Sequence, residues 1–195
     1  MKVNGVTINK HGRGAMYYSN GDVYKGNWSN NKQNGEGEYT STDGTTYTGE
    51  WVAGQKHGEG VETLPDNTRY DGLYVNNKKQ GRGTLYFEDS SKYEGYFHNN
   101  MRNGQGKFQW ADGKVYQGEW KSDKMDGKGK IEWRNGNSYQ GDFCDDKRHG
   151  YGEFKWVNGI VYKGDWRNGK QHGIGIFIGS DGIQRKEQWA DGKRI

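Results

Sequence analysis

Cysteine, aliphatic side chains and long apolar runs are scarce in this sequence, and each shortage excludes a class of protein. The one cysteine, Cys144, cannot form an internal disulfide, which excludes a disulfide-stabilised domain and fits a reducing compartment. No apolar run approaches the roughly 18 residues of a membrane-spanning helix, and the first residues lack the apolar stretch of a secretion signal. We therefore expect a soluble, cytoplasmic protein.

The hydrophobic content is too low for an ordinary globular core. Only 29% of the residues are hydrophobic and the mean hydropathy is −1.28, values typical of disordered chains. Two features oppose disorder: aromatic residues reach 14%, and a net charge of +4 is too small to hold the chain open by self-repulsion. The apolar contacts are therefore expected to be thin and largely aromatic.

What the sequence does have is repetition with a period of 23 residues. A tyrosine recurs at this period, followed two residues later by glycine and four residues later by an aromatic ring. A second motif, Gly-x-Gly, recurs at the same period, with its first glycine at positions from Gly12 to Gly173. An uninterrupted tandem array predicts a repeat protein with a long surface rather than a catalytic pocket. The tyrosines are Tyr24, Tyr47, Tyr70, Tyr93, Tyr116, Tyr139 and Tyr162, and the rings are Trp28, Trp51, Tyr74, Phe97, Trp120, Phe143 and Trp166.

Within one repeat, the residues alternate with the spacing of a β-strand. Tyr116 and Trp120 fall on one face, whereas Gln117 and Glu119 fall on the other. Asn-Gly or Asp-Gly pairs separate such segments and are typical of tight hairpin turns. The sequence therefore predicts an all-β fold: an elongated, twisted, single-layer antiparallel sheet of stacked β-hairpin repeats.

Two details of the repeat carry structural expectations. Asn67 and Ser90 stand where other repeats have the turn glycine, so we expect these two hairpins to be looser. The glycines inside strands are expected to leave room for a ring from the neighbouring strand to lie over the backbone. The expected organisation is an N-terminal cap or half strand over 1–11, seven to eight hairpin repeats over 12–182, and a degenerate half repeat or cap over 183–195.

The combination Tyr-x-Gly-x-Trp, Gly-x-Gly and Asp/Asn-Gly at a period of 23 resembles the MORN repeat, from Gly12 to about Gly192. The resemblance implies extended antiparallel sheets of stacked hairpins. It also implies scaffolds in cilia, the cytoskeleton and membrane junctions, with lipid headgroups or partner helices as ligands of some members. The last unit departs from the pattern, because Arg185 replaces the tyrosine and Glu187 the glycine, whereas Trp189 is kept.

The aromatic face has two compatible interpretations. The inner rings can simply hold the sheet together, but a single layer leaves part of its apolar face open, and large exposed apolar patches mark interaction surfaces. We therefore predict a trough that holds a partner helix or extended peptide. Its predicted contact residues are Trp110, Trp133, Trp156, Phe108, Phe154, Trp120, Trp166 and Tyr139.

At the C-terminal end, Ile174, Ile176 and Ile178 replace the usual polar residues. One interpretation is a cap that packs under the tail with Ile183 and Ile195. The other is an edge for docking or for an end-to-end homodimer.

Basic residues gather at one set of loop tips and are expected to form a ridge along one edge of the sheet. Such a ridge suits anionic lipid headgroups, although edge lysines also serve to discourage strand addition. A pI near 8.9 with mixed charges is a weak nucleic-acid footprint, and no nucleic acid is expected. The ridge residues are Lys78, Lys79, Arg102, Lys124, Lys147, Arg148 and Lys170.

One slot of the repeat is often histidine, but we expect no metal and no cofactor there. Equivalent positions in adjacent repeats lie about 9–10 Å apart, whereas zinc ligands lie about 2.1 Å from a shared ion. Other repeats have hydrogen-bonding side chains in this slot, which favours a structural polar role. The slot holds His11, Asn34, His57, Gln80, Asn103, Asp126, His149 and His172.

No catalytic set lies outside the repeat pattern, and Gly-x-Gly opens a strand rather than a phosphate-binding loop. The favoured function is a non-enzymatic protein–protein interaction scaffold in a cytoskeletal or ciliary assembly. The alternatives are a peripheral membrane adaptor for anionic phospholipid headgroups, and the non-catalytic targeting region of a longer enzyme if the natural chain continues beyond Ile195.

Overall fold

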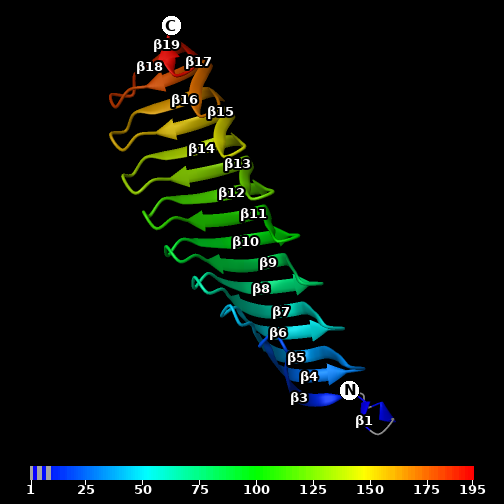
Figure 1. Cartoon of the computed structure of the whole chain (residues 1–195). Coiled ribbons are helices and arrows are strands. Elements are labelled where there is room, and N and C mark those ends of the chain that lie inside the picture. The colour runs from blue at the N-terminus through cyan, green and yellow to red at the C-terminus, as the bar shows by residue number, and fades with distance from the viewer. Residues whose placement is uncertain (1, 4–5, 8–9) are drawn as a thin grey trace. The chain divides into compact units, whose positions relative to one another are not determined.

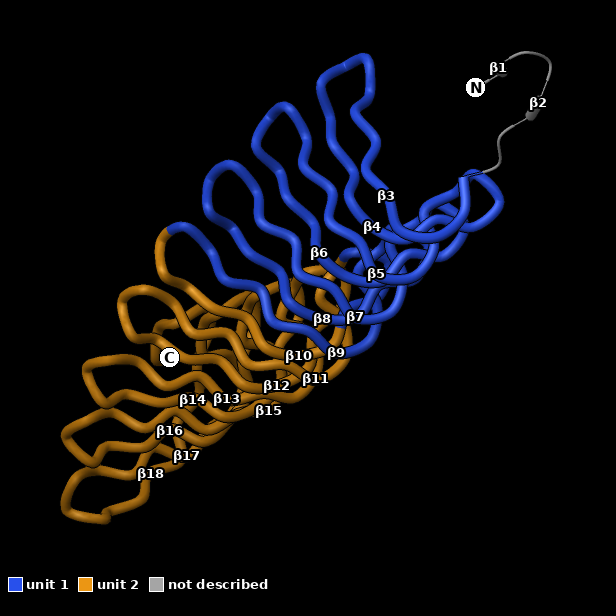
Figure 2. The backbone as a smooth tube through the Cα atoms, turned by 90° about the horizontal axis from the view of Figure 1, so that it is seen from below, with its two compact units in different colours: residues 1–88, 97–100 blue, residues 89–96, 101–195 orange. Residues whose placement is uncertain are grey.

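The computed structural model describes residues 2–3, 6–7 and 10–195, and its strands follow the 23-residue repeat (Figure 1). Contacts divide the chain into unit 1, residues 1–88 and 97–100, and unit 2, residues 89–96 and 101–195 (Figure 2). The prediction of an N-terminal cap over 1–11 falls largely outside the described residues; within that range β1 (Lys2–Val3) pairs with β2 (Val6–Thr7). Across the described ranges, no helix has the length and hydropathy needed to cross a membrane.

Unit 1 is an antiparallel sheet in which each strand pairs with the next strand in the chain. Among its described residues no pairing returns to the first strand, so the sheet is open. Its strands are β3 (Gly12–Tyr17), β4 (Val23–Ser29), β5 (Lys32–Thr40), β6 (Thr46–Val52), β7 (Gln55–Thr63), β8 (Arg69–Val75) and β9 (Lys78–Tyr86).

Unit 2 is built in the same way and is also open over the residues that the structure describes. The predicted all-β class, a single-layer antiparallel sheet of stacked hairpins, is confirmed in both units. β10 (Lys92–His98) contributes residues to both units. The other strands are β11 (Met101–Gln109), β12 (Val115–Lys121), β13 (Lys124–Glu132), β14 (Ser138–Cys144), β15 (Lys147–Lys155), β16 (Val161–Arg167), β17 (Lys170–Ile178), β18 (Gln184–Ala190) and β19 (Lys193–Arg194).

The turns adopt the conformations that their residues predict. In the turn between β12 and β13, Ser122 and Asp123 both have positive φ, 48° and 69°, as a two-residue hairpin turn requires. Asn67 has a positive φ, 64°, as the turn glycines of other repeats do, and its N–H closes the turn on the Leu64 carbonyl at 3.0 Å. The expectation of a looser hairpin at Asn67 is therefore wrong, because asparagine tolerates this region at low cost.

Each two-residue turn is also bonded to the preceding hairpin. Asp123 donates its N–H to the carbonyl of Arg102 at 3.0 Å, and its carboxylate accepts the N–H of Arg102 at 2.9 Å. Asn77 makes the same pair of bonds with Lys56. The hairpins of each unit are thus linked through their turns as well as through the sheet.

The first glycine of each Gly-x-Gly pair marks a β-bulge. Between Gly26 and Trp28 the register of β4 and β5 shifts, so that residues 34–36 lie opposite Asn27 alone. Gly35 has φ +88°, which a residue with a side chain rarely adopts. A bulge bends its strand and increases the twist. The same bulge occurs in β5, β7, β9, β13, β15 and β17.

The second glycine lies beneath a tyrosine ring, as predicted. A Cβ added to Gly37 would lie 2.3 Å from the hydroxyl oxygen of Tyr24. That hydroxyl donates a hydrogen bond to the carbonyl of Asn27 at 2.9 Å. All seven repeat tyrosines are at most 1% exposed, so a single-layer sheet buries large side chains by folding them over its own backbone.

The buried rings form a continuous edge-to-face chain within each unit. Tyr24 contacts Trp28 of its own strand at 5.1 Å and Trp51 two strands away at 5.3 Å between ring centroids, both nearly perpendicular. Four residues of a straight strand span about 13 Å, so Tyr24 and Trp28 meet only because their side chains converge across the intervening glycine. Edge-to-face pairs add about 0.5–1.5 kcal/mol each beyond area burial, and this chain replaces the missing aliphatic core.

Candidate interaction surface

One position of the repeat holds a basic or sulfur-containing side chain in most repeats, and the basic ones lie over the ring chain. In unit 2 the guanidinium of Arg148 lies 4.2 Å from the ring centre of Trp166, and that of Arg102 lies 4.5 Å from that of Trp120. Met125 occupies the same slot between them and is 8% exposed. Burial lowers the pKa of Arg148, which nevertheless stays charged as arginines in proteins do.

These covers remove most of the predicted trough from contact with solvent. Trp120, Trp166 and Tyr139 are at most 4% exposed, and Phe108 and Phe154 are 7% and 8% exposed. These five side chains are buried in the described structure, so the proposal of a partner contact below is confined to the residues that stay half-buried. The physical reason is that neighbouring rings and the arginine stems seal the inner part of the apolar face.

The other three predicted residues remain half-buried and form a row, which we call the tryptophan row: Trp110, Trp133 and Trp156. Each follows directly on a strand of unit 2, β11, β13 or β15. Trp156 contacts Phe154 at 4.6 Å and Phe177 at 6.2 Å, and Trp133 contacts Phe154 at 5.4 Å. Trp133 and Trp156 therefore rest on the buried Phe154 and the half-buried Phe177, whereas the Lys114 ammonium lies 3.7 Å from the ring centre of Trp110.

The indole N–H groups distinguish the tryptophan row from the inner tryptophans. Trp120 and Trp166 donate to the carbonyls of Gly106 and Gly152, each at 3.2 Å. Within the described ranges, no indole N–H of the tryptophan row has a protein acceptor. These three groups are donors available to a ligand.

The turns that carry the row are fixed against one another. The backbone of Trp156 closes its turn with hydrogen bonds to Ile160 and Gly159. The N–H of Val157 donates to the side-chain oxygen of Asn137 at 2.9 Å, and the Val157 side chain packs against Gly136. The row is therefore held by the sheet and by its turns, not by mobile loops.

The isoleucine end forms a second, smaller apolar surface on the opposite face of unit 2. Ile174 and Ile176 are 53% and 40% exposed and border a hollow of about 520 Å³ together with Tyr151, whereas Ile178 is half-buried. Ile183 and Ile195 are 54% and 73% exposed.

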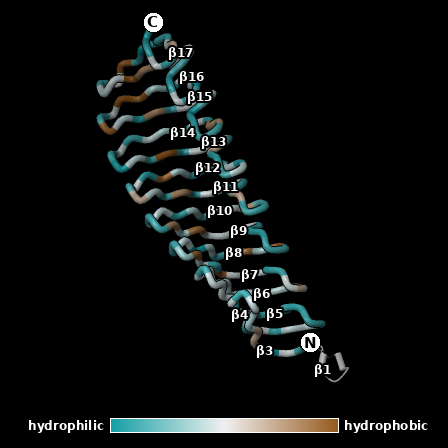
Figure 3. Tube along the Cα trace, viewed as in Figure 1, coloured by the Kyte–Doolittle hydropathy of each residue, from teal (hydrophilic) through white to brown (hydrophobic). Residues whose placement is uncertain are grey.

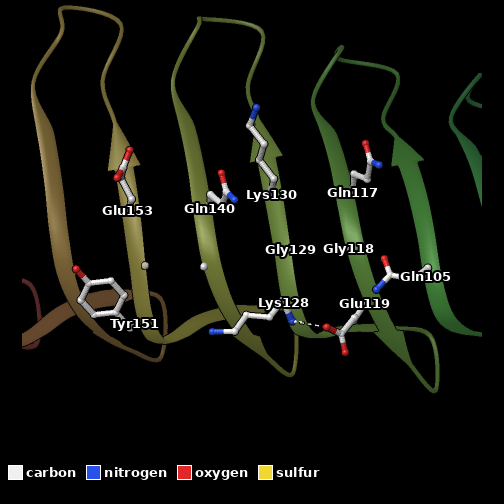
Figure 4. A pocket seen from close by; sticks show the side chains of 12 residues that line it. Gln105, Gln117, Gly118, Glu119, Lys128, Gly129, Lys130, Gln140, Tyr151 and Glu153 are labelled. Carbon is white, nitrogen blue, oxygen red and sulfur yellow. Dashed lines mark hydrogen bonds between the residues drawn. The ribbon is translucent and has the colours of Figure 1, made fainter.

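The polar face carries a wider hollow of about 780 Å³ over β11–β15 (Figure 4). Backbone glycines lie at its centre, and glutamine and charged side chains at its rim. The rim charges satisfy one another: the carboxylate of Glu119 accepts the N–H of Lys128 at 3.1 Å, and the Lys128 ammonium pairs with Asp142. Colouring along the chain shows hydrophobic positions interspersed among hydrophilic ones (Figure 3).

The predicted basic ridge divides into two groups. Lys79, Arg102 and Arg148 fold over rings and are half-buried. Lys78, Lys124, Lys147 and Lys170 are exposed at the tips, and Lys124 is paired with Asp145 at 2.7 Å.

Side chains of the histidine slot make the polar contacts that the sequence predicts in the repeats of Gln80 and His172. The side chain accepts a backbone N–H from the next turn, as Gln80 does from Asn99 at 3.1 Å and His172 from Asp191 at 3.4 Å. His57 differs, because its buried Nδ1 has no partner. Among the described residues, no three His, Cys, Asp or Glu side chains gather as a metal site would require.

The sequence of the repeat matches a known family over residues 9–184. The MORN repeat matches eight consecutive segments: residues 9–23, 24–46, 47–69, 70–92, 93–115, 116–138, 139–161 and 162–184. The chain belongs to the MORN repeat family. Comparison with curated protein sequences gives no match.

Among solved structures, this MORN array is similar in fold to TCP domains. The TCP10 domain of Danio rerio CPAP has a TM-score of 0.53 at 16% identity, covering 94% of this chain and 87% of that one. The same domain in complex with a peptide of Danio rerio STIL has a TM-score of 0.55 at 17% identity, covering 94% and 81%. The SAS-4 TCP domain of Drosophila melanogaster, in complex with a proline-rich motif of Ana2, has a TM-score of 0.50 at 13% identity, covering 91% and 90%.

Two features of the MORN sheet escape sequence reasoning, although each has a signal. The first is the bulge at the first glycine of each pair, where φ is positive. The sequence shows glycine at both positions of the pair and does not indicate that only the first has positive φ. The covering side chains do recur at a period of 23, but as Lys56, Lys79, Arg102, Met125 and Arg148 they look like loop-tip residues of mixed chemistry.

Proposed function

We propose that this MORN repeat protein is a non-enzymatic interaction scaffold whose unit 2 holds a segment of a partner protein along the tryptophan row. The observation that carries the proposal is the contrast within one face: the inner rings are sealed, whereas three tryptophans stay half-buried with unbonded indole N–H groups. Tryptophan is enriched among the residues that dominate binding energy at interfaces.

The fold likeness supports the same proposal. TCP domains of similar fold have been solved in complex with a peptide of STIL and with a proline-rich motif of Ana2. We extend the proposal to a cytoskeletal or ciliary assembly, which rests on the family resemblance.

Affinity purification followed by mass spectrometry tests the proposal. The double variant Trp133→Ala/Trp156→Ala is expected to lose a partner that the unchanged protein retains. Leu64→Ala is the matched control, because Leu64 is a half-buried apolar residue at an equivalent position of unit 1. Equal recovery of every partner by the double variant and the control would place the binding surface elsewhere.

A further inference from the structure

We propose that the segment held by the tryptophan row is a polyproline II helix with a proline at every third residue. The inference rests on the proposed function and specifies the conformation and sequence period of the partner segment.

The first argument is the spacing of the row. Trp110, Trp133 and Trp156 follow strands that are two positions apart in the sheet, so their backbones repeat about every 9.6 Å. A polyproline II helix has three residues per turn and a rise of 3.1 Å, so every third residue recurs after about 9.3 Å on the same side.

An α-helix fits the row less well. Its side chains return to the same face after about seven residues, or about 10.5 Å. Over the two intervals of the row this accumulates an offset of about 2 Å, against about 0.6 Å for polyproline II. The ring contacts agree with the shorter repeat, since Trp133 and Trp156 lie 5.4 Å and 4.6 Å from the same ring, Phe154.

The second argument is hydrogen bonding. The backbone carbonyls of polyproline II have no internal partners, whereas those of an α-helix are bonded within the helix. The three indole N–H groups of the row are donors without a protein acceptor in the described ranges. A row of donors beside aromatic surface matches free carbonyls beside proline rings, which is how aromatic grooves recognise proline-rich segments.

The third argument is the preformed state of the row. The turns behind it are bonded and packed to one another through Asn137, Val157 and Gly136. A polyproline II segment is also stiff before binding, so neither partner loses much conformational freedom on association. Unit 1 has no tryptophan in this slot, where it carries Tyr18, Ser41, Leu64 and Phe87.

The test is isothermal titration of the full chain with three synthetic 12-residue peptides. The first has proline at every third position, the second has the same composition with its four prolines adjacent, and the third is an amphipathic helix former with leucines at helical spacing. The first is expected to bind at least ten-fold more tightly than either of the others.

Variants separate ring contact from hydrogen bonding. Trp133→Ala is expected to weaken binding of the first peptide at least ten-fold, Trp133→Phe several-fold because it keeps a ring and removes the N–H, and Leu64→Ala not at all. Thermal melts verify that each variant is folded. Equal binding of the first two peptides, tighter binding of the helix former, or indifference to Trp133→Ala would overturn the inference.

The inference and the proposed function fail in different ways. If no peptide of the first kind binds while the tryptophan double variant still loses a partner in the purification, the scaffold proposal stands and the polyproline assignment falls. If neither experiment responds to the tryptophan variants, both fall.

Discussion

The second glycine of each Gly-x-Gly pair is fixed by the ring that lies on it. We expect Gly37→Ala to lower the free energy of unfolding by about 2–3 kcal/mol, because the new methyl group would lie 2.3 Å from the Tyr24 hydroxyl oxygen and 2.5 Å from its ring. Urea unfolding measures the change. Gly14→Ala is the matched control in the same slot, where the methyl group would meet only Trp28 at 3.8 Å. Equal losses in both variants would show that crowding by Tyr24 is not the cause.

The slot that covers the rings requires volume more than charge. Met125 occupies in one repeat the place that Arg148 takes in the next; Met125 is 8% exposed, and Arg148 lies over the ring chain. We expect Arg148→Met to change the free energy of unfolding by less than about 1 kcal/mol, and Arg148→Ala to lower it by about 2 kcal/mol through lost packing and the lost cation–π contact. Thermal unfolding of both variants checks this. A methionine variant as unstable as the alanine variant would show that the guanidinium itself is required.

At the scale of strands, one carboxylate connects three elements of unit 1. Glu62 of β7 takes a slot that is Tyr39 in β5, and it pairs with Lys56 of its own strand, with Lys79 of β9 at 3.4 Å and with the Tyr74 hydroxyl of β8 at 3.1 Å. Burial alone would raise its pKa, but the hydrogen bond and charge of Lys56 and the charge of Lys79 hold the pKa of Glu62 below its ordinary value.

A carboxyl group whose pKa is lowered by folding stabilises the protein above its unfolded pKa, and this stability is lost as the pH falls through the folded pKa. We therefore expect Glu62→Gln to lower the free energy of unfolding by about 1–2 kcal/mol at pH 7, and to differ little from the unchanged protein near pH 2–3. Urea unfolding at both pH values measures the difference. A deficit of equal size at both values would assign the effect to packing and not to charge.

The elements show where sequence reasoning succeeds and where it stops. Period, strand alternation and turn residues predict the hairpins, because each depends on the backbone preferences of single residues. The buried state of Trp120 and Tyr139 is not predictable in this way, since it depends on a bulge and on Arg102 and Arg148 folding back from the turn. The sequence does single out Trp110, Trp133 and Trp156, because the repeat pattern does not require a tryptophan at this position.

At the scale of the whole molecule, the covering of the rings also decides what the basic residues can do. The net charge is +4, and Lys79, Arg102 and Arg148 point their charges at aromatic rings. Among the predicted ridge lysines of unit 2, those without an ion-pair partner in the described structure are Lys147 and Lys170. A lysine near an anionic surface contributes about 1 kcal/mol, so two of them give about 2 kcal/mol, too little to retain a protein on a membrane.

We therefore expect no recovery of the protein with floated vesicles that contain phosphatidylserine, beyond that with neutral vesicles, at physiological salt. The reason is electrostatic: at an ionic strength of 0.15 M, charges more than about 8 Å from the surface are screened, which leaves only the tip lysines to act. Flotation at low and physiological salt measures the effect, and Lys147→Ala/Lys170→Ala is the variant to compare. Salt-sensitive flotation that this variant abolishes would support the phospholipid adaptor instead, and would make the tips rather than the tryptophan row the functional surface of unit 2.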